Sequence, residues 1–147
     1  MSKVTALYHI VFCTKARQMT IPLEYANDLY RSIWKESTDM DCYLLRVGGI
    51  QNHVHLLIDL NPKVALADLM RNVKAHSSGW MRADNRFPDF IGWAGEYFGC
   101  SISPEQKYAV IEYIKGQQEH HLGNPFDNEL VGMYRCADLD YHDMDLR

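Results

Sequence analysis

The chain has 147 residues, of which 47% are hydrophobic and 23% are charged, as is typical of a globular protein. This length suffices for one core, and no apolar run approaches the roughly 20 residues that span a bilayer. The first residues lack the apolar segment of a signal peptide, and the four cysteines are widely spaced without a C-x-x-C pair. We therefore expect one cytoplasmic domain with reduced thiols.

The charge is distributed unevenly along the chain. The whole sequence carries 15 basic and 19 acidic residues. Residues 125–147 hold six acidic residues against two basic ones, which leaves 13 of each in residues 1–124. We expect a domain over residues 1–124 and an acidic, flexible, solvated C-terminal tail over residues 125–147. A neutral domain can still bind nucleic acid through a local basic patch, with a strong dependence on salt.

The hydrophobic pattern predicts seven elements in chain order. They are a strand at 4–14, a helix at 23–38, strands at 42–49 and 53–60, a helix at 64–84, a strand at 95–102 and a helix at 103–122. The two middle strands suggest a hairpin with a bulge near Gly48-Gly49. This order is typical of the α+β class and indicates a ferredoxin-like split βαβ fold: an antiparallel sheet with helices on one face, followed by a C-terminal helix.

The strand predicted at 53–60 carries two histidines on one face. Side chains alternate along a strand, so His53 and His55 project to one side, about 7 Å apart at their Cα atoms. Val54, Leu56 and Ile58 project to the other side and suit a core. Two imidazoles at this spacing can converge on one metal ion, although half-exposed strand histidines without a chemical role show the same pattern.

The helix predicted at 64–84 has an apolar face and a basic one. A row of polar and basic side chains follows the outer face and continues just beyond the helix: Arg71, Lys74, Ser78, Arg82 and Arg86. Such a row can track a phosphate backbone, where lysine and arginine supply affinity independent of base sequence. The alternative is an ordinary solvated helix face.

The last predicted helix begins with a clear signal. Ser103 is a good N-cap, Pro104 suits the first helical position and Gln106 completes a capping box. Tyr113 and Gln117 are four residues apart, so on a continuous helix they stand one turn above each other beside the apolar stripe. By themselves they could be boundary residues of the core.

Together these blocks resemble one family. The chain resembles the single-tyrosine HUH transposases of small bacterial insertion sequences in two motifs. These are His53-Val54-His55 and, some sixty residues later, Tyr113-x-x-x-Gln117. Residues 8–15 resemble the opening strand of that family, residues 74–78 its second helix, and residues 113–121 its tyrosine helix. The four blocks occur in the order found in the family and span residues 4 to about 122.

The resemblance implies a mechanism. Tyr113 would attack the scissile phosphate of single-stranded DNA to form a 5′-phosphotyrosine, which a second DNA end can displace. His53, His55 and Gln117 would hold Mg²⁺ or Mn²⁺ against the phosphate oxygens. The resemblance also implies hairpin DNA ends as substrates and a homodimer, in which the tyrosine helix commonly crosses to the partner subunit and makes each active site composite.

Three other functions fit the same residues. One is a domesticated HUH nuclease that acts on host repeats with the same chemistry. Another is a non-catalytic nucleic-acid-binding module on the same fold, which would be expected to have lost the tyrosine or the metal ligands. The third is a metal-dependent hydrolase without a covalent step, for which Tyr113→Phe would keep its activity.

Overall fold

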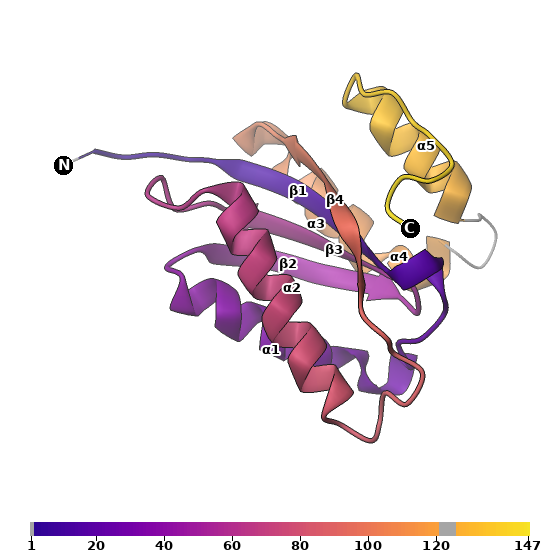
Figure 1. Cartoon of the computed structure of the whole chain (residues 1–147). Helices are drawn as coiled ribbons and strands as arrows, with labels where there is room; N and C mark the ends of the chain where they lie inside the picture. The colour runs from indigo at the N-terminus through magenta and orange to yellow at the C-terminus, as the bar shows by residue number, and fades with distance from the viewer. Residues whose placement is uncertain (1, 121–125) are drawn as a thin grey trace.

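A computed structural model describes residues 2–120 and 126–147. It contains one antiparallel four-stranded sheet of order β2-β3-β1-β4 with helices on both faces (Figure 1). The strands are β1 (Leu7–Thr14), β2 (Tyr43–Ile50), β3 (His53–Asp59) and β4 (Trp93–Ser101). The helices are α1 (Ala26–Asp39), α2 (Leu66–Arg82), α3 (Lys107–Lys115), α4 (Gln117–His120) and α5 (Phe126–Cys136). The three short 3₁₀ segments are η1 (Lys15–Arg17), η2 (Leu23–Tyr25) and η3 (Pro104–Gln106).

The predicted fold class is confirmed. The element order β-α-β-β-α-β is that of a ferredoxin-like α+β fold, and all strand pairs are antiparallel. β2 and β3 form the expected hairpin through a turn at Gln51-Asn52. The bulge is displaced from its predicted place, because the register shifts between Leu44 and Arg46 while both glycines stay in the ladder.

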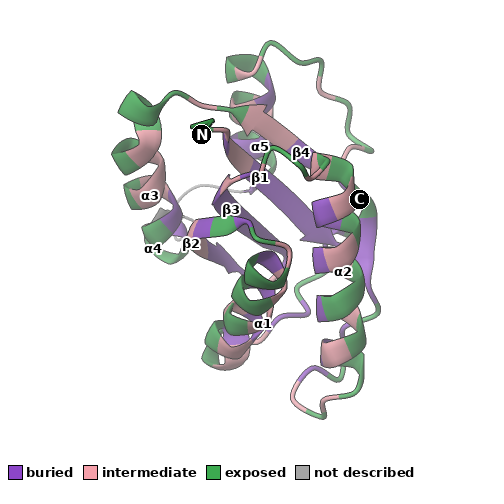
Figure 2. Ribbon diagram, turned by 90° about the vertical axis from the view of Figure 1, so that its left-hand side faces the viewer, coloured by how far each residue is buried: buried purple, intermediate pink, exposed green. Residues whose placement is uncertain are grey.

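One face of the sheet packs against α1 and α2 and forms the main core. Val54, Leu56 and Ile58 of β3 are fully buried there, as strand alternation predicts. The two central strands, β1 and β3, are mostly buried between the helix layers, whereas much of β4 is partly exposed (Figure 2). Each such side chain contributes about 1.5–3 kcal/mol through removal from water, so this layer stabilises the sheet that carries the histidines.

The C-terminal residues differ from the prediction of a solvated tail. α5 packs on the opposite face of the sheet, where Phe126, Leu130 and Tyr134 are buried against Val11, Cys13 and Phe98. The three apolar residues recur every four positions and so share one helical face, a pattern that the acidic net charge obscures. Leu146, near the chain end, is buried in the same cluster. The division into a domain at 1–124 and a tail at 125–147 remains a prediction.

A buried arginine connects η1 to the C-terminal segment. Arg17 has a positive φ of 55° and a side chain that is only 4% exposed. Its guanidinium donates hydrogen bonds to Asp127 Oδ1 at 2.7 Å, to Tyr141 Oη at 3.3 Å and to the carbonyl oxygen of Asp145. These contacts join both ends of the C-terminal segment to the end of β1.

The predicted helix at 103–122 is interrupted. Ser103 and Gln106 form the expected capping box at its start, but Gly116 ends α3, and α4 begins at Gln117. Tyr113 and Gln117 therefore lie on two helical segments instead of one continuous helix. The end predicted at residue 122 lies outside the described residues.

Gly48 lets α3 rest directly on β2. A Cβ atom at this position would lie 2.9 Å from the carbonyl oxygen of Ile114. Gly48 is also the β2 partner of His55 in the ladder. The close approach of helix and strand therefore sets the height of α3 above the histidine strand.

Gly48→Ala is expected to lower the free energy of unfolding by about 1–3 kcal/mol, because the added methyl group overpacks the contact with α3. The matched control is Gly79→Ala in α2, where a Cβ would meet nothing within 4 Å. That control should be neutral or stabilise by about 0.5–1 kcal/mol. Urea unfolding of both variants measures this, and equal stabilities would contradict the close packing of α3 on β2.

Arg17→Met is expected to loosen α5 without unfolding the sheet, because it removes the hydrogen bonds to the C-terminal segment and keeps an apolar side chain. The loss of about 1–3 kcal/mol predicts amide hydrogen exchange about 5- to 150-fold faster in α5. Lys15→Met, at an exposed neighbouring position, is the control. Unchanged exchange in α5 would show that Arg17 does not hold this helix.

Candidate active site

His53 and His55 lie on the face of β3 that α3, α4 and α5 cover. Both side chains are fully buried, and their ring centroids are 5.0 Å apart. The shared face is the one that strand alternation predicts, whereas the complete burial is a consequence of the C-terminal helices. Two fully buried imidazoles require polar partners, since an unpaired buried polar group is costly.

Each imidazole has a partner at its Nδ1 atom. His53 Nδ1 lies 2.8 Å from Asn52 Oδ1, and the Nδ2 group of Asn52 donates to the Arg17 carbonyl, which orients the amide. His55 Nδ1 lies 2.9 Å from Nε2 of His9 on β1. Burial, followed by the nearby His55, lowers the pKa of His9 to about 3, so His9 is neutral. In a neutral imidazole with its proton on Nδ1, the Nε2 atom is an acceptor or a metal ligand; with the proton on Nε2, His55 instead donates to Glu129.

Tyr113 and Gln117 reach these histidines from the same chain. Gln117 Oε1 lies 2.9 Å from His53 Nε2. The Tyr113 ring stands edge-on to His55, with 5.6 Å between ring centroids. The structure thus brings together all four residues that the sequence motifs single out, and it does so in cis. Exchange of the tyrosine helix between subunits remains a prediction.

Glu129 of α5 is a fifth residue of the site, and the motifs did not reveal it. Its Oε1 atom lies 2.9 Å from His55 Nε2 and accepts a hydrogen bond from the Tyr113 hydroxyl. The Glu129 side chain is only 2% exposed. The one available signal was its position three residues after Phe126, which places it beside the apolar face of a helix that had been interpreted as tail.

The carboxylate and the phenol influence each other. Burial opposes ionisation of Glu129, but the hydrogen bonds from His55 and Tyr113 lower the pKa of its carboxyl to about 2. Burial and the hydrogen bond to Glu129 raise the pKa of the Tyr113 phenol above its usual range. Tyr113 therefore keeps its proton in this arrangement, and it can act as a nucleophile only after that proton has left.

The donor set fits a divalent cation. His53, His55 and Glu129 each offer one ligand atom, and these atoms lie within 4.8 Å of one another. Gln117 adds an amide oxygen beside His53. The carboxylate and amide oxygens suit Mg²⁺ or Mn²⁺, the imidazole nitrogens suit transition metals such as Zn²⁺ or Fe²⁺, and any divalent cation would offset the negative charge of Glu129.

A cavity of about 600 Å³ opens beside Tyr113, between β4 and α5. His9, Phe98, Glu129 and Met133 are among the residues that line it. The nucleophile candidate therefore faces a space large enough for a nucleotide, with an aromatic ring in its wall.

The predicted basic row on α2 separates into two groups. Lys74, Ser78 and Arg82 line a groove of about 260 Å³ together with Lys15 and the start of β4. Lys74 Nζ donates to the carbonyl oxygen of Ala94 at 2.6 Å, and burial lowers its pKa. Thr14, at the end of β1, pairs with Trp93 at the start of β4. The groove therefore lies at the same end of the sheet as His53, whose ladder partner is Cys13.

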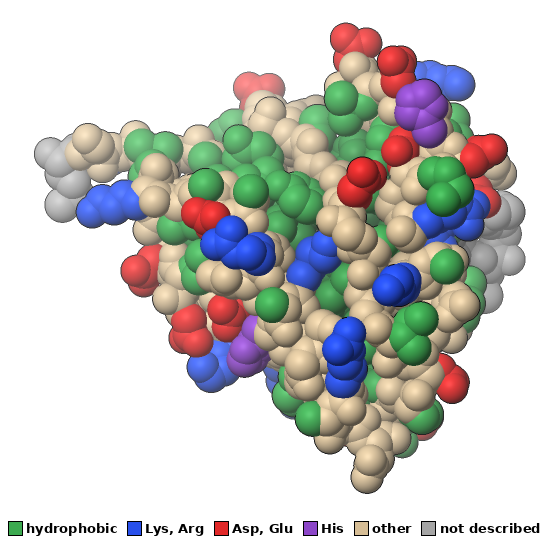
Figure 3. Space-filling view, viewed as in Figure 1, with side chains coloured by type: hydrophobic (Ala, Val, Ile, Leu, Met, Phe, Trp, Pro, Cys, Tyr) green, Lys and Arg blue, Asp and Glu red, His purple; other side chains and the backbone are tan. Residues whose placement is uncertain are grey.

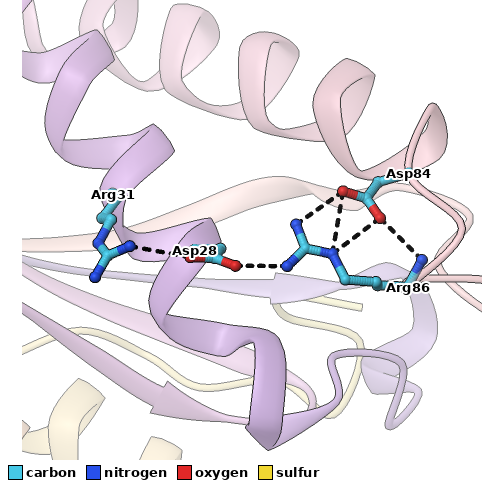
Figure 4. A network of polar contacts seen from close by, with 4 residues as sticks. All are labelled: Asp28, Arg31, Asp84 and Arg86. Carbon is cyan, nitrogen blue, oxygen red and sulfur yellow. Dashed lines mark hydrogen bonds and ion pairs between the residues drawn. The ribbon is translucent and has the colours of Figure 1, made fainter.

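Arg71 and Arg86 make local ion pairs outside this groove. Arg71 pairs with Asp68 one turn earlier on the exposed surface of α2. Arg86 binds Asp84 and Asp28, so it connects the segment after α2 to α1 (Figure 4). On this side of the molecule, basic side chains alternate with acidic and apolar ones (Figure 3). The row thus offers separate basic positions instead of one continuous basic surface.

The four cysteines form no disulfide bonds. Within the described ranges, no helix has the length and apolar character that crossing a membrane requires.

Comparison with known proteins gives consistent matches. The model of the family described as "Transposase IS200 like" matches residues 2–117. The ISDra2 transposase TnpA of Deinococcus radiodurans is 22% identical over 119 residues, which cover 76% of this chain and 84% of that protein.

Two solved structures share the fold. A transposase structure from Deinococcus radiodurans R1 superposes with a TM-score of 0.62 at 23% identity and covers 80% of this chain and 95% of that one. A REP-associated tyrosine transposase bound to a REP hairpin has a TM-score of 0.60 at 15% identity and covers 82% of this chain and 74% of that one. Because the family model covers most of the chain, this protein belongs to the IS200-like transposase family.

Proposed function

We propose that this protein cleaves and rejoins single-stranded DNA, with Tyr113 as the nucleophile and with His53, His55 and Gln117 as ligands of a divalent cation, Mg²⁺ or Mn²⁺. Membership of the transposase family supports DNA strand transfer as the reaction class. The observation that carries the assignment of residues is the position of Tyr113 at the buried histidine pair, next to a cavity.

The reaction conserves the energy of the phosphodiester bond. The Tyr113 oxygen attacks the scissile phosphorus, the bond from phosphorus to the 3′ oxygen breaks, and the released strand leaves with a 3′-hydroxyl. A second 3′-hydroxyl then attacks the phosphotyrosine, re-forms a phosphodiester and restores the phenol. A bound divalent cation supplies Lewis-acid polarisation of the phosphoryl group.

The residues of the chain orient these steps. Asn52 and His9 hold the two imidazoles so that their Nε2 atoms face the site. α3, resting on β2 at Gly48, holds the Tyr113 ring over His55. Such pre-organisation places nucleophile and phosphate at a fixed separation, which is a major source of rate in phosphoryl transfer.

The substrate is proposed to be single-stranded DNA with hairpin ends. The REP-associated relative, which shares the fold, was solved with a hairpin. The groove lined by Lys15, Lys74 and Arg82 supplies positive charge at the end of the sheet that carries His53. Ser78 lines the same groove, and Arg71 and Arg86 complete the proposed DNA-binding set with weaker roles, since both arginines already have carboxylate partners. A homodimer and a cytoplasmic location also remain predictions.

A domesticated nuclease that acts on host repeats is the second candidate, favoured by the shared fold with the REP-associated transposase. It would use the same four residues. The genomic surroundings of the gene separate these two functions, because a mobile element carries its own DNA ends.

Tyr113→Phe is expected to abolish the covalent protein–DNA adduct, because phenylalanine has no attacking oxygen. Tyr108→Phe, on the same helix with a 71% exposed side chain, is the matched control and should form the adduct at the wild-type level. The assay incubates the protein with Mn²⁺ and labelled oligonucleotides from the flanks of its gene and resolves adducts on denaturing gels. Metal-dependent cleavage by both variants would contradict the nucleophile assignment, and DNA binding without any cleavage would favour a binding module.

Lys74→Ala and Arg82→Ala are each expected to weaken binding of single-stranded DNA. In each variant, the plot of the logarithm of the binding constant against the logarithm of salt concentration should become less steep by about 0.7, as expected for one lost phosphate contact. Arg71→Ala and Arg86→Ala should change the slope less, because Asp68, Asp84 and Asp28 already neutralise these side chains. Fluorescence anisotropy over a salt series measures the slopes. Equal slopes for all four variants would argue against the groove as the DNA path.

A further inference from the structure

We propose that Glu129 is a ligand of the divalent cation, so that the C-terminal helix α5 completes the metal centre. This inference rests on the proposed cation site of His53, His55 and Gln117. It adds to that site a charged ligand from a segment that lies outside residues 2–117, which the family model matches.

The first argument is the direction of the ligand atoms. Asn52 and His9 occupy the Nδ1 atoms of the two histidines, so the Nε2 atoms point into the same space. Gln117 Oε1 faces one of them at 2.9 Å and Glu129 Oε1 faces the other at 2.9 Å. When Nε2 carries no proton, both contacts bring a nitrogen lone pair close to an oxygen lone pair. A cation held by these atoms would replace this repulsion with coordination.

The second argument is charge. Glu129 is buried to 2% exposure in a site whose other donors are two imidazoles and an amide. A buried carboxylate needs compensation by positive charge or by several hydrogen bonds. Arg17, which is the buried arginine of this region, instead binds Asp127 and the chain end. A divalent cation at the histidines would add positive charge directly beside this carboxylate.

Contacts that do not involve the carboxylate hold Glu129 in place. Phe126, one turn earlier on α5, stacks on the His53 ring with 3.7 Å between centroids and 2° between planes. Leu130 is fully buried in the adjoining cluster, and Arg17 anchors Asp127. These three contacts would fix the start of α5 even without Glu129, so the carboxylate is delivered to the histidines by packing.

A structural role of Glu129 is the competing explanation. In that case the carboxylate only accepts the hydrogen bond from Tyr113 and ties α5 to α3. The two explanations differ in one property that needs no DNA and no turnover: the affinity of the folded protein for Mn²⁺. A ligand role requires that this affinity depend on the charge at position 129.

The experiment titrates Mn²⁺ into the full-length protein without DNA and follows free Mn²⁺ by electron paramagnetic resonance. Glu129→Gln keeps the shape and removes the charge, and we expect at least tenfold weaker binding. Glu112→Gln, an exposed position on α3 that pairs with Lys115, is the matched control and should bind like wild type. Glu129→Asp keeps the charge with a shorter side chain, and its affinity should fall between those of wild type and Glu129→Gln. Amide exchange of α5 in every variant reports whether the helix is still docked.

The outcomes separate this inference from the function on which it rests. Loss of Mn²⁺ affinity in His55→Ala and Glu129→Gln, with α5 still protected, supports the ligand role. Wild-type affinity in Glu129→Gln, together with loss in His55→Ala, overturns the inference and leaves the histidine site intact. The inference is also overturned if the Mn²⁺ affinities of wild type, Glu129→Gln and Glu129→Asp correlate with the amide-exchange protection of α5 and not with the charge at position 129. Equal affinities of wild type and His55→Ala would overturn the cation site itself.

Discussion

The burial of two imidazoles on one face of β3 is the constraint on which the rest of the structure depends. A strand of a split βαβ sheet usually faces helices on one side only, and here the second side carries nitrogen atoms that cannot be left without partners. Asn52 and His9 satisfy the outer nitrogens, and Gln117 and Glu129 face the inner ones. Three helical segments from the second half of the chain cover this face, and each brings a polar side chain or an aromatic ring to it.

Much of the fold and part of the site follow from local rules. The common face of His53 and His55 is a consequence of strand alternation, and the burial of Val54, Leu56 and Ile58 is its counterpart on the other face. The capping box at Ser103 correctly marked the beginning of the helical region that carries Tyr113. The break at Gly116 was missed, because a glycine near a helix end is compatible with both a continuous helix and a C-cap.

The role of the C-terminal segment could not be predicted from the net charge of residues 125–147. Six acidic residues over residues 125–147 indicated a solvated tail, yet Glu129 is buried at the histidines, and the exposed Asp127 pairs with the buried Arg17. Which acid is buried depends on long-range packing of Phe126, Leu130 and Tyr134 on a sheet face. Similarly, the basic row on α2 was divided by partners such as Asp28, which is distant in sequence from Arg86.

The central claim is that one tyrosine of this chain becomes covalently attached to DNA at the histidine site. Mass spectrometry of the protease-digested adduct tests it most directly, because the peptide that carries the nucleotide identifies the attacking residue among nine tyrosines. The account predicts that the mass of the nucleotide is located on Tyr113 through a phosphotyrosine bond. An adduct on another residue, such as exposed Tyr108 on the same helix, would contradict it.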